Sequence, residues 1–216
     1  MLFRSGMDAV IGTSAMHLEG ARKEIARMLD MAKINVDRSF HAFIHADTAA
    51  IDDVEERENY IDYLNKEISR AISKMMIHET NEKSSKNIGS YFEMTGNIER
   101  IGDHAVNICD YTNLLRERQI TFSKEAVQEM QEMREICRQM FDRLRQAPEN
   151  PEEWLQNIHD SENFIDKKTD EFYENHLERI RKGLCNDEAC VVFSELLTDF
   201  ERIGDHLWNI AKEMGK

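Results

Sequence analysis

Four pairs of carboxylates with the spacing Glu-x-x-x-Asp are the part of the sequence that could do chemistry. Residues four apart on a helix lie about 5–6 Å apart on one face, so each pair would place two carboxylates side by side. Carboxylate oxygens that converge without a basic residue are typical of sites for cations such as Mg²⁺, Mn²⁺, iron or zinc. We therefore expect clusters that bind metal, the alternative being a solvated acidic face. The candidate ligands are Glu58, Asp62, Glu99, Asp103, Glu162, Asp166, Glu201 and Asp205.

These pairs belong to an internal repeat. Residues 99–108 read ERIGDHAVNI and residues 201–210 read ERIGDHLWNI, which are identical at eight of ten positions. A second match, ENYID at 58–62 and ENFID at 162–166, has nearly the same offset. Because both matches recur at an offset of about 102 residues, we interpret the chain as a duplication of one structural unit.

The residues beside the two matched aspartates also recur. Gly102 and Gly204 precede them, although glycine inside a helix costs about 1 kcal/mol relative to alanine. We expect a neighbouring helix or a ligand to approach closely at each glycine, and a purely packing role is the alternative. His104 and His206 follow the aspartates and are interpreted as groups that support a metal site, with direct ligation as the less favoured reading.

The elements that must position these residues are long helices. Helical spacing of apolar residues predicts six of them, at 15–44, 53–78, 81–118, 124–146, 151–181 and 187–214. Asn150 before Pro151 predicts a helix N-cap, Gly183 predicts a helix end, and Asn186 predicts a second cap. Such long helices favour an all-α fold of two tandem three-helix bundles. We expect a linker or tail at 1–14, a first three-helix unit at 15–118 and a second at 119–216.

Composition excludes several classes of protein. The chain has 42 Asp and Glu against 28 Lys and Arg, a formal net charge of −14, and only 9 Gly and 2 Pro. The acidity argues against a nucleic-acid partner, and the scarcity of turn residues argues against sandwiches and barrels. Four cysteines without a C-x-x-C pair predict neither a zinc ribbon nor a disulfide scaffold. No apolar run approaches the roughly 20 residues of a membrane helix, so we expect a cytoplasmic protein.

At the repeated motifs the sequence resembles the PhoU family of phosphate-uptake regulators. The resemblance rests on the tandem three-helix unit with E/D-x-x-x-D motifs and on the R-I-G-D-x-x-x-N-I helix, and it covers residues 21–214. It implies that the eight carboxylates hold multinuclear clusters of iron or zinc on the bundle surface. It also implies a negative regulator that acts between a phosphate transporter and a sensor kinase.

The stretch at residues 7–28 is more similar to a cytoplasmic PhoU-like C-terminal domain of bacterial sodium/phosphate cotransporter family proteins than to a free-standing regulator. In that case the partner would be the chain's own membrane domain, at the cytoplasmic face of the inner membrane. We expect a homo-oligomer in either setting.

The main hypothesis is a non-enzymatic, metal-binding regulatory domain of phosphate uptake or phosphate signalling. No nucleophile elbow and no Cys–His pair in a catalytic context is present, which argues against an enzyme. Two alternatives stay open. One is a metal-dependent hydrolase built on the carboxylate clusters, and the other is a metal-free helical adaptor whose acidic face binds a basic partner.

Overall fold

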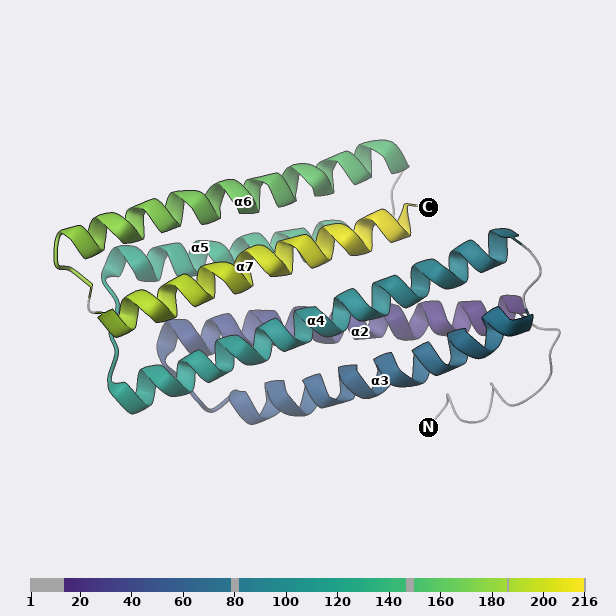
Figure 1. The fold of residues 1–216 in the computed structure, drawn as a ribbon, viewed down its shortest axis with the longest axis horizontal. Helices are drawn as coiled ribbons and strands as arrows, with labels where there is room; N and C mark the ends of the chain where they lie inside the picture. The colour runs from purple at the N-terminus through teal and green to yellow at the C-terminus, as the bar shows by residue number, and fades with distance from the viewer. Residues whose placement is uncertain (1–13, 79–81, 147–149, 186, 216) are drawn as a thin grey trace.

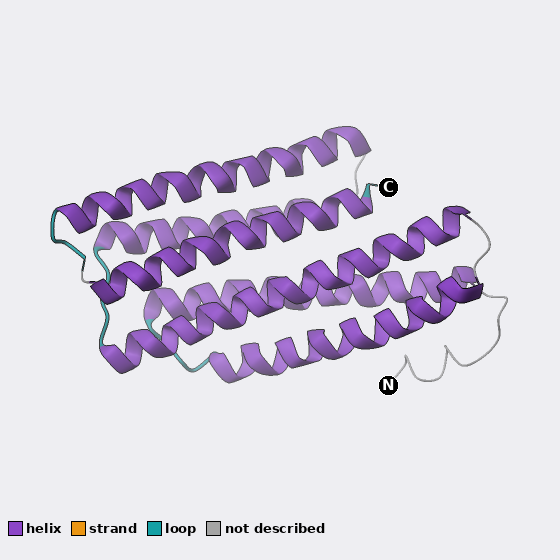
Figure 2. Cartoon of the chain, viewed as in Figure 1, coloured by secondary structure: helices purple, strands orange, loops and turns teal. Residues whose placement is uncertain are grey.

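The computed structural model describes residues 14–78, 82–146, 150–185 and 187–215 of the 216-residue chain. The described residues form six α-helices and no strand, as Figure 2 shows, which confirms the all-α class. The predicted helices agree with the observed ones to within a few residues at each end. In chain order the helices are α2 (Ser14–His45), α3 (Ile51–His78), α4 (Glu82–Arg118), α5 (Lys124–Leu144), α6 (Pro151–Arg181) and α7 (Asp187–Met214).

The helices are arranged as two three-helix bundles that lie side by side with their long axes roughly aligned (Figure 1). The first bundle consists of α2, α3 and α4, and the second consists of α5, α6 and α7. The bundles contact each other where α4 packs on α7 and α2 packs on α5. The tandem three-helix organisation expected from the repeat is therefore confirmed.

One continuous hydrophobic core runs through both bundles. Its largest fully buried side chains include Phe40 and Phe43 from α2, Phe141 from α5, and Phe193 and Phe200 from α7. Because the apolar stripes of all six helices face one another, the outer faces carry the charged residues. None of the described helices has a stretch long and apolar enough to span a bilayer.

Local signals in the sequence set the helix ends. The Asn150 side chain accepts hydrogen bonds from the amides of Glu152 and Glu153, with Pro151 in the first turn of α6, as predicted. Gly183 has a φ of +66°, a left-handed conformation that favours glycine and ends α6. The predicted cap at Asn186 lies outside the described residues, as does almost all of the predicted tail at 1–14.

Candidate metal centre

In the first bundle, four of the candidate ligands lie on two helices that pack against each other. Glu58 and Asp62 are on α3, and Glu99 and Asp103 are on α4. A Cβ atom at Gly102 would lie 3.5 Å from Cγ of Glu58, so the α3 carboxylate stem runs directly against the α4 backbone. The four residues are called the first carboxylate quartet.

The second bundle repeats this arrangement on α6 and α7. Glu162 and Asp166 are on α6, Glu201 and Asp205 are on α7, and these four form the second carboxylate quartet. At Gly204 a Cβ atom would lie 2.9 Å from Cδ1 and 3.0 Å from Cγ2 of Ile165, closer than side chains tolerate. In both copies the glycine is therefore a point where a neighbouring helix approaches, and the groups that fill the space are side chains of that helix.

The first quartet is electrostatically strained. Partial burial raises the pKa values of Glu58, Glu99 and Asp103, and repulsion from the other carboxylates of the quartet raises them further. Asp62 contributes to the repulsion felt by all three. The four acids therefore lie near enough to sense one another's charge.

The second quartet shows the same pattern. Burial is the largest cause of the raised pKa values of Glu162, Asp166 and Glu201, and the negative charge of Asp205 raises all three further. A cation placed among these groups would relieve the repulsion, which is the electrostatic condition for a metal site.

The carboxylate oxygens nevertheless do not converge on one point. Among the described residues, neither quartet supplies three ligand atoms close enough together to hold an ion. Asp62 pairs with Lys66, Asp205 accepts a hydrogen bond from Arg202 at 3.2 Å, and Glu162 lies 3.9 Å from Nε2 of His159. The donor set fits hard and borderline cations in its oxygen chemistry and charge. To bind one ion together, the side chains would have to turn away from these ion pairs.

The two histidines beside the matched aspartates meet across the two bundles. His104 on α4 pairs through Nδ1 with Asp199 at 2.6 Å, and His206 on α7 donates through Nδ1 to Asn97 at 2.9 Å. Their rings stack with centroids 5.4 Å apart. Burial lowers the pKa of His206 to about 4, so this ring is neutral at pH 7. The Nδ1 atoms of both histidines thus have partners in the interface between the bundles.

A surface cavity of about 470 Å³ lies between the first quartet and this histidine pair. Glu58 and Asp103 contribute to one part of its lining, and Arg100 adds a positive charge. Acidic, basic and imidazole side chains therefore line one cavity. The sequence did not predict this cavity, because its lining comes from three helices, α3, α4 and α7. Its lining is Glu58, Arg100, Asp103, His104, Val106, Asn107 and His206.

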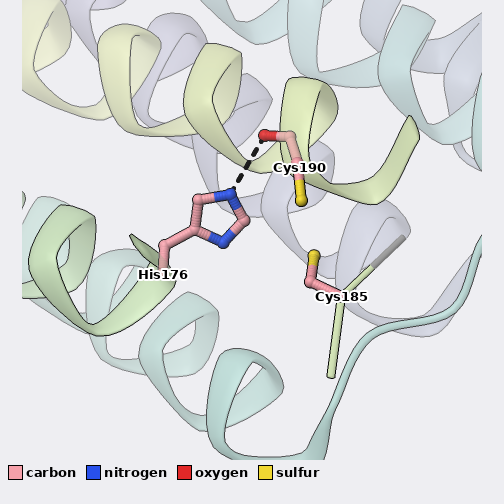
Figure 3. Close-up of side chains that lie close together, drawn as sticks. All are labelled: His176, Cys185 and Cys190. Atoms are coloured by element: carbon pink, nitrogen blue, oxygen red, sulfur yellow. Dashed lines mark hydrogen bonds between the residues drawn. The ribbon is translucent and has the colours of Figure 1, made fainter. Parts of the chain in front are cut away.

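One group of ligand-type side chains was not anticipated from the sequence. His176, Cys185 and Cys190 lie together at the turn between α6 and α7, as Figure 3 shows. Their spacing matches no known metal-binding motif, so the only signal was the presence of two cysteines and a histidine around one predicted turn.

Comparison with known proteins gives consistent matches along the chain. A family model described as the PhoU domain matches residues 25–112 and 130–214, one match in each bundle. The chain is 24% identical over 195 residues to the phosphate-specific transport system accessory protein PhoU homolog 1 of Thermotoga maritima, covering 89% of this chain and 83% of that protein. It is 22% identical over 194 residues to a Xylella fastidiosa accessory protein PhoU homolog, covering 88% and 79%.

Solved structures show the same fold. The crystal structure of PhoU from Pseudomonas aeruginosa superimposes with a TM-score of 0.84 at 19% identity, covering 92% of this chain and 95% of that one. The phosphate transport system regulatory protein PhoU from Streptococcus pneumoniae gives a TM-score of 0.79 at 14% identity, with 94% and 95% covered.

Proposed function

The chain belongs to the PhoU family, and we propose that it is a non-enzymatic regulator of phosphate uptake or phosphate signalling that binds metal through its two carboxylate quartets. Its similarity to accessory proteins of phosphate-specific transport systems supports the regulatory role. The observation that carries the metal proposal is the recurrence of the same acidic quartet in both bundles, each time beside a glycine that faces the neighbouring helix.

The metal is proposed to be iron or zinc, with Mg²⁺ or Mn²⁺ as the oxygen-preferring alternatives. Bound cations would convert an acidic surface into one that attracts phosphate or the carboxylates of a partner. The chain's own contribution is to hold four acids on two adjacent helices, where partial burial keeps their mutual repulsion strong. Beside the first quartet, Arg100 lines the adjoining cavity, where its guanidinium group could donate hydrogen bonds to a bound anion.

The partner we propose is a component of a phosphate transporter, or a membrane domain of the same protein, with a sensor kinase as a second partner. Accessory proteins of transport systems among the relatives support a transporter partner. We further propose that the protein acts at the cytoplasmic face of the inner membrane and that it does so as a homo-oligomer. No nucleic-acid partner is proposed, because the net charge of −14 opposes one.

Metal binding is tested by measuring the iron, zinc and manganese content of the reconstituted protein. The double variants Glu99→Ala/Asp103→Ala and Glu201→Ala/Asp205→Ala should each lose the ions of one quartet. Glu174→Ala/Glu178→Ala is the matched control, because it removes two acids at the same spacing from the exposed face of α6. Equal metal content in all three variants would contradict the proposal.

The regulatory role is tested in cells that lack the gene and are complemented with the wild-type chain or with the double variants. Loss of the protein should change phosphate uptake and phosphate-responsive transcription, and the quartet variants should fail to restore them. Unchanged transport and signalling in both phosphate-rich and phosphate-poor medium would contradict this role. Turnover of phosphate esters by the metal-loaded protein, abolished in the double variants, would instead identify a hydrolase.

A further inference from the structure

Three side chains with nitrogen and sulfur donors converge at the end of the second bundle where α6 turns into α7. One ring nitrogen of His176 and the Sγ atoms of Cys185 and Cys190 all lie within 4.8 Å of one another. Figure 3 shows both sulfur atoms on the same side of the imidazole ring. Among the described residues, these form the one group of three or more His, Cys, Asp or Glu side chains close enough to hold a metal ion.

The turn between the helices fixes this arrangement. The amide of Gly183 donates to the carbonyl of Ile180 at 2.9 Å, and the amide of Leu184 donates to the carbonyl of Arg179 at 2.9 Å. With Gly183 in the left-handed conformation, these bonds close the end of α6 and reverse the chain. Cys185 therefore follows the reversal directly, and Cys190 lies in the first turn of α7.

His176 is held as a neutral imidazole in one orientation. Its side chain is 1% exposed, stacks on Phe193 with centroids 4.7 Å apart, and donates from Nε2 to the carbonyl oxygen of Cys190 at 3.1 Å. A carbonyl oxygen can only accept, so Nε2 carries the hydrogen and Nδ1 has a free lone pair. Burial lowers the pKa of His176, which keeps the ring uncharged at pH 7. Metal-binding histidines usually have their second ring nitrogen bound in this way to a carbonyl or carboxylate.

The Cys185 thiol suits a metal better than it suits nucleophilic chemistry. Burial, with a contribution from the neighbouring Cys190, raises the pKa of Cys185 to about 12, so this thiol is protonated at pH 7. A protonated thiol is a poor nucleophile, whereas a bound dication displaces the proton directly. Two thiolates and one dication have no net charge, and the adjacent buried ion pair of Arg179 with Glu129, at 2.7 Å, is also neutral.

We propose that His176, Cys185 and Cys190 form a Zn²⁺ site that clamps the α6–α7 turn, with water in the fourth position. Nitrogen and thiolate donors are the ligands that zinc prefers, and three protein ligands with one open position is an established zinc arrangement. On binding, the two S–H bonds break, the two protons pass to solvent, two Zn–S bonds and one Zn–N bond form, and no electron is transferred. Tetrahedral coordination needs donor separations of about 3.5–3.8 Å, so the two cysteine side chains would move towards the fixed imidazole by rotating about χ1.

This site is separate from the second carboxylate quartet. At 1.5 Å per residue, His176 is about 15 Å along α6 from Asp166, and Cys190 is about 16 Å along α7 from Glu201. The zinc proposal therefore does not rest on the proposed function. Metal bound at the carboxylates would leave the turn unchanged, and metal bound at the turn would leave the carboxylates free.

The test uses Co²⁺ as a spectroscopic substitute for Zn²⁺ in the full-length, fully reduced protein. We expect a thiolate-to-cobalt charge-transfer absorption that saturates at one ion per chain and disappears when Zn²⁺ is added. Cys185→Ser and Cys190→Ser should each abolish this absorption and weaken binding by at least 10-fold. Cys109→Ala is the matched control, because it removes a buried thiol that lies in α4, and it should keep the absorption. The quartet variants Glu99→Ala/Asp103→Ala and Glu201→Ala/Asp205→Ala should also keep it.

Absence of the charge-transfer absorption from the reduced wild-type protein, or its persistence in both serine variants, would overturn the proposal. A second measurement guards against variants that fold poorly. It uses the quadruple variant Glu99→Ala/Asp103→Ala/Glu201→Ala/Asp205→Ala, in which the quartets no longer bind zinc. In this variant, free Zn²⁺ at 100 times the Kd of the turn site should raise the Tm by about 5–10 °C. That rise should vanish when Cys185→Ser is added, and the added substitution should leave the metal-free Tm unchanged. An equal zinc-dependent rise with and without Cys185→Ser would also overturn the proposal.

Discussion

At the scale of single residues, the carboxylate quartets are positions where folding partly buries acidic groups and brings their negative charges close together. Glu99 has a raised pKa because it is partly buried and because Asp103 and Asp62 are nearby. A carboxyl group whose pKa is higher in the folded state than in the unfolded state stabilises the fold while it is protonated. That contribution is present below the unfolded pKa and is lost as the pH rises through the folded pKa. At neutral pH the quartets therefore destabilise the metal-free protein.

The first prediction follows from this destabilisation by ionised carboxylates at neutral pH. Glu99→Gln should raise the free energy of unfolding of the metal-free protein at pH 7 by about 0.2–0.5 kcal/mol, because it removes repulsion within the quartet. In the same variant, added Mn²⁺ should stabilise the protein less than it stabilises the wild type. Thermal unfolding with and without metal, between pH 4 and pH 8, measures both effects. The gain over the wild type should shrink towards pH 4, where the wild-type carboxyl groups take up protons.

Glu93→Gln is the control for this prediction, because Glu93 is exposed on the same helix and outside the quartet. It should leave the response to Mn²⁺ unchanged. A wild-type protein that unfolds at the same temperature with and without metal, at every pH, would contradict the idea that the quartets bind cations.

The sequence identified the acids of both quartets but not their environment. Their positions on one helix face follow from the spacing of four, which is a local property of the chain. The ion pair of Asp62 with Lys66 is also local, and it competes with metal binding at Asp62. The spacing of the residues does not say which of the two interactions is the stronger. The cluster of His176, Cys185 and Cys190 depends on the course of a turn, which no periodic pattern encodes.

At the scale of the helices, the two matched glycines differ in how tightly the neighbouring helix packs. A Cβ atom at Gly102 would make ordinary contact, 3.5 Å from Glu58, whereas one at Gly204 would lie 2.9–3.0 Å from two carbon atoms of Ile165. The repeat predicted equivalent glycines. The difference arises from the partner side chains, which the sequence match does not describe.

The second prediction is therefore a pair of alanine substitutions with opposite effects. Gly102→Ala should raise the free energy of unfolding by about 0.5–1 kcal/mol, because alanine is the better helix former and finds room. Gly204→Ala should lower it by about 1 kcal/mol, since overpacking against the branched carbon atoms of Ile165 outweighs the same propensity gain. Urea unfolding of both variants measures the difference. Stabilisation by both substitutions would show that α6 can move away from α7 at little cost.

The third prediction concerns the start of α6. Asn150→Ala should lower the free energy of unfolding by about 1 kcal/mol, because the amides of Glu152 and Glu153 lose their hydrogen-bond acceptor. Asn150→Asp keeps an acceptor oxygen at this position and should retain the wild-type stability. Equal melting temperatures for the alanine and aspartate variants would mean that water caps this helix as well as Asn150 does.

At the scale of the whole molecule, the duplication predicted two bundles but not how they associate. The hydrophobic core is continuous because α4 contributes buried residues to its own bundle and to the contact with α7. The apolar pattern of α4 is weaker than that of α7, although both helices pack on their own bundle and on each other. In neither helix does the pattern indicate which helix of the other bundle it will contact. This is why the cavity and the histidine pair, which both lie at the junction of the bundles, could not be assigned from the sequence.

The fourth prediction is that the two bundles unfold as one cooperative unit and that Asp199 contributes to this coupling. Asp199 on α7 is 3% exposed and accepts hydrogen bonds from His104 at 2.6 Å and Asn107 at 3.2 Å, both on α4. In the wild type, the calorimetric enthalpy should equal the van't Hoff enthalpy, because separating the bundles would expose apolar surface on each.

Removing the carboxylate leaves polar groups of α4 without their acceptor while the apolar contact stays in place. Asp199→Ala should therefore lower the free energy of unfolding by about 1–3 kcal/mol. Because the loss falls on the interface between the bundles and not within either one, the ratio of calorimetric to van't Hoff enthalpy should rise above one as the bundles begin to melt separately. Asp110→Ala, at an exposed position on α4, is the control and should change neither quantity. A destabilised Asp199→Ala protein whose enthalpy ratio stays at one would show that the apolar contacts of α4 with α7 and of α2 with α5 suffice to hold the bundles together, and that Asp199 stabilises the fold without coupling its halves.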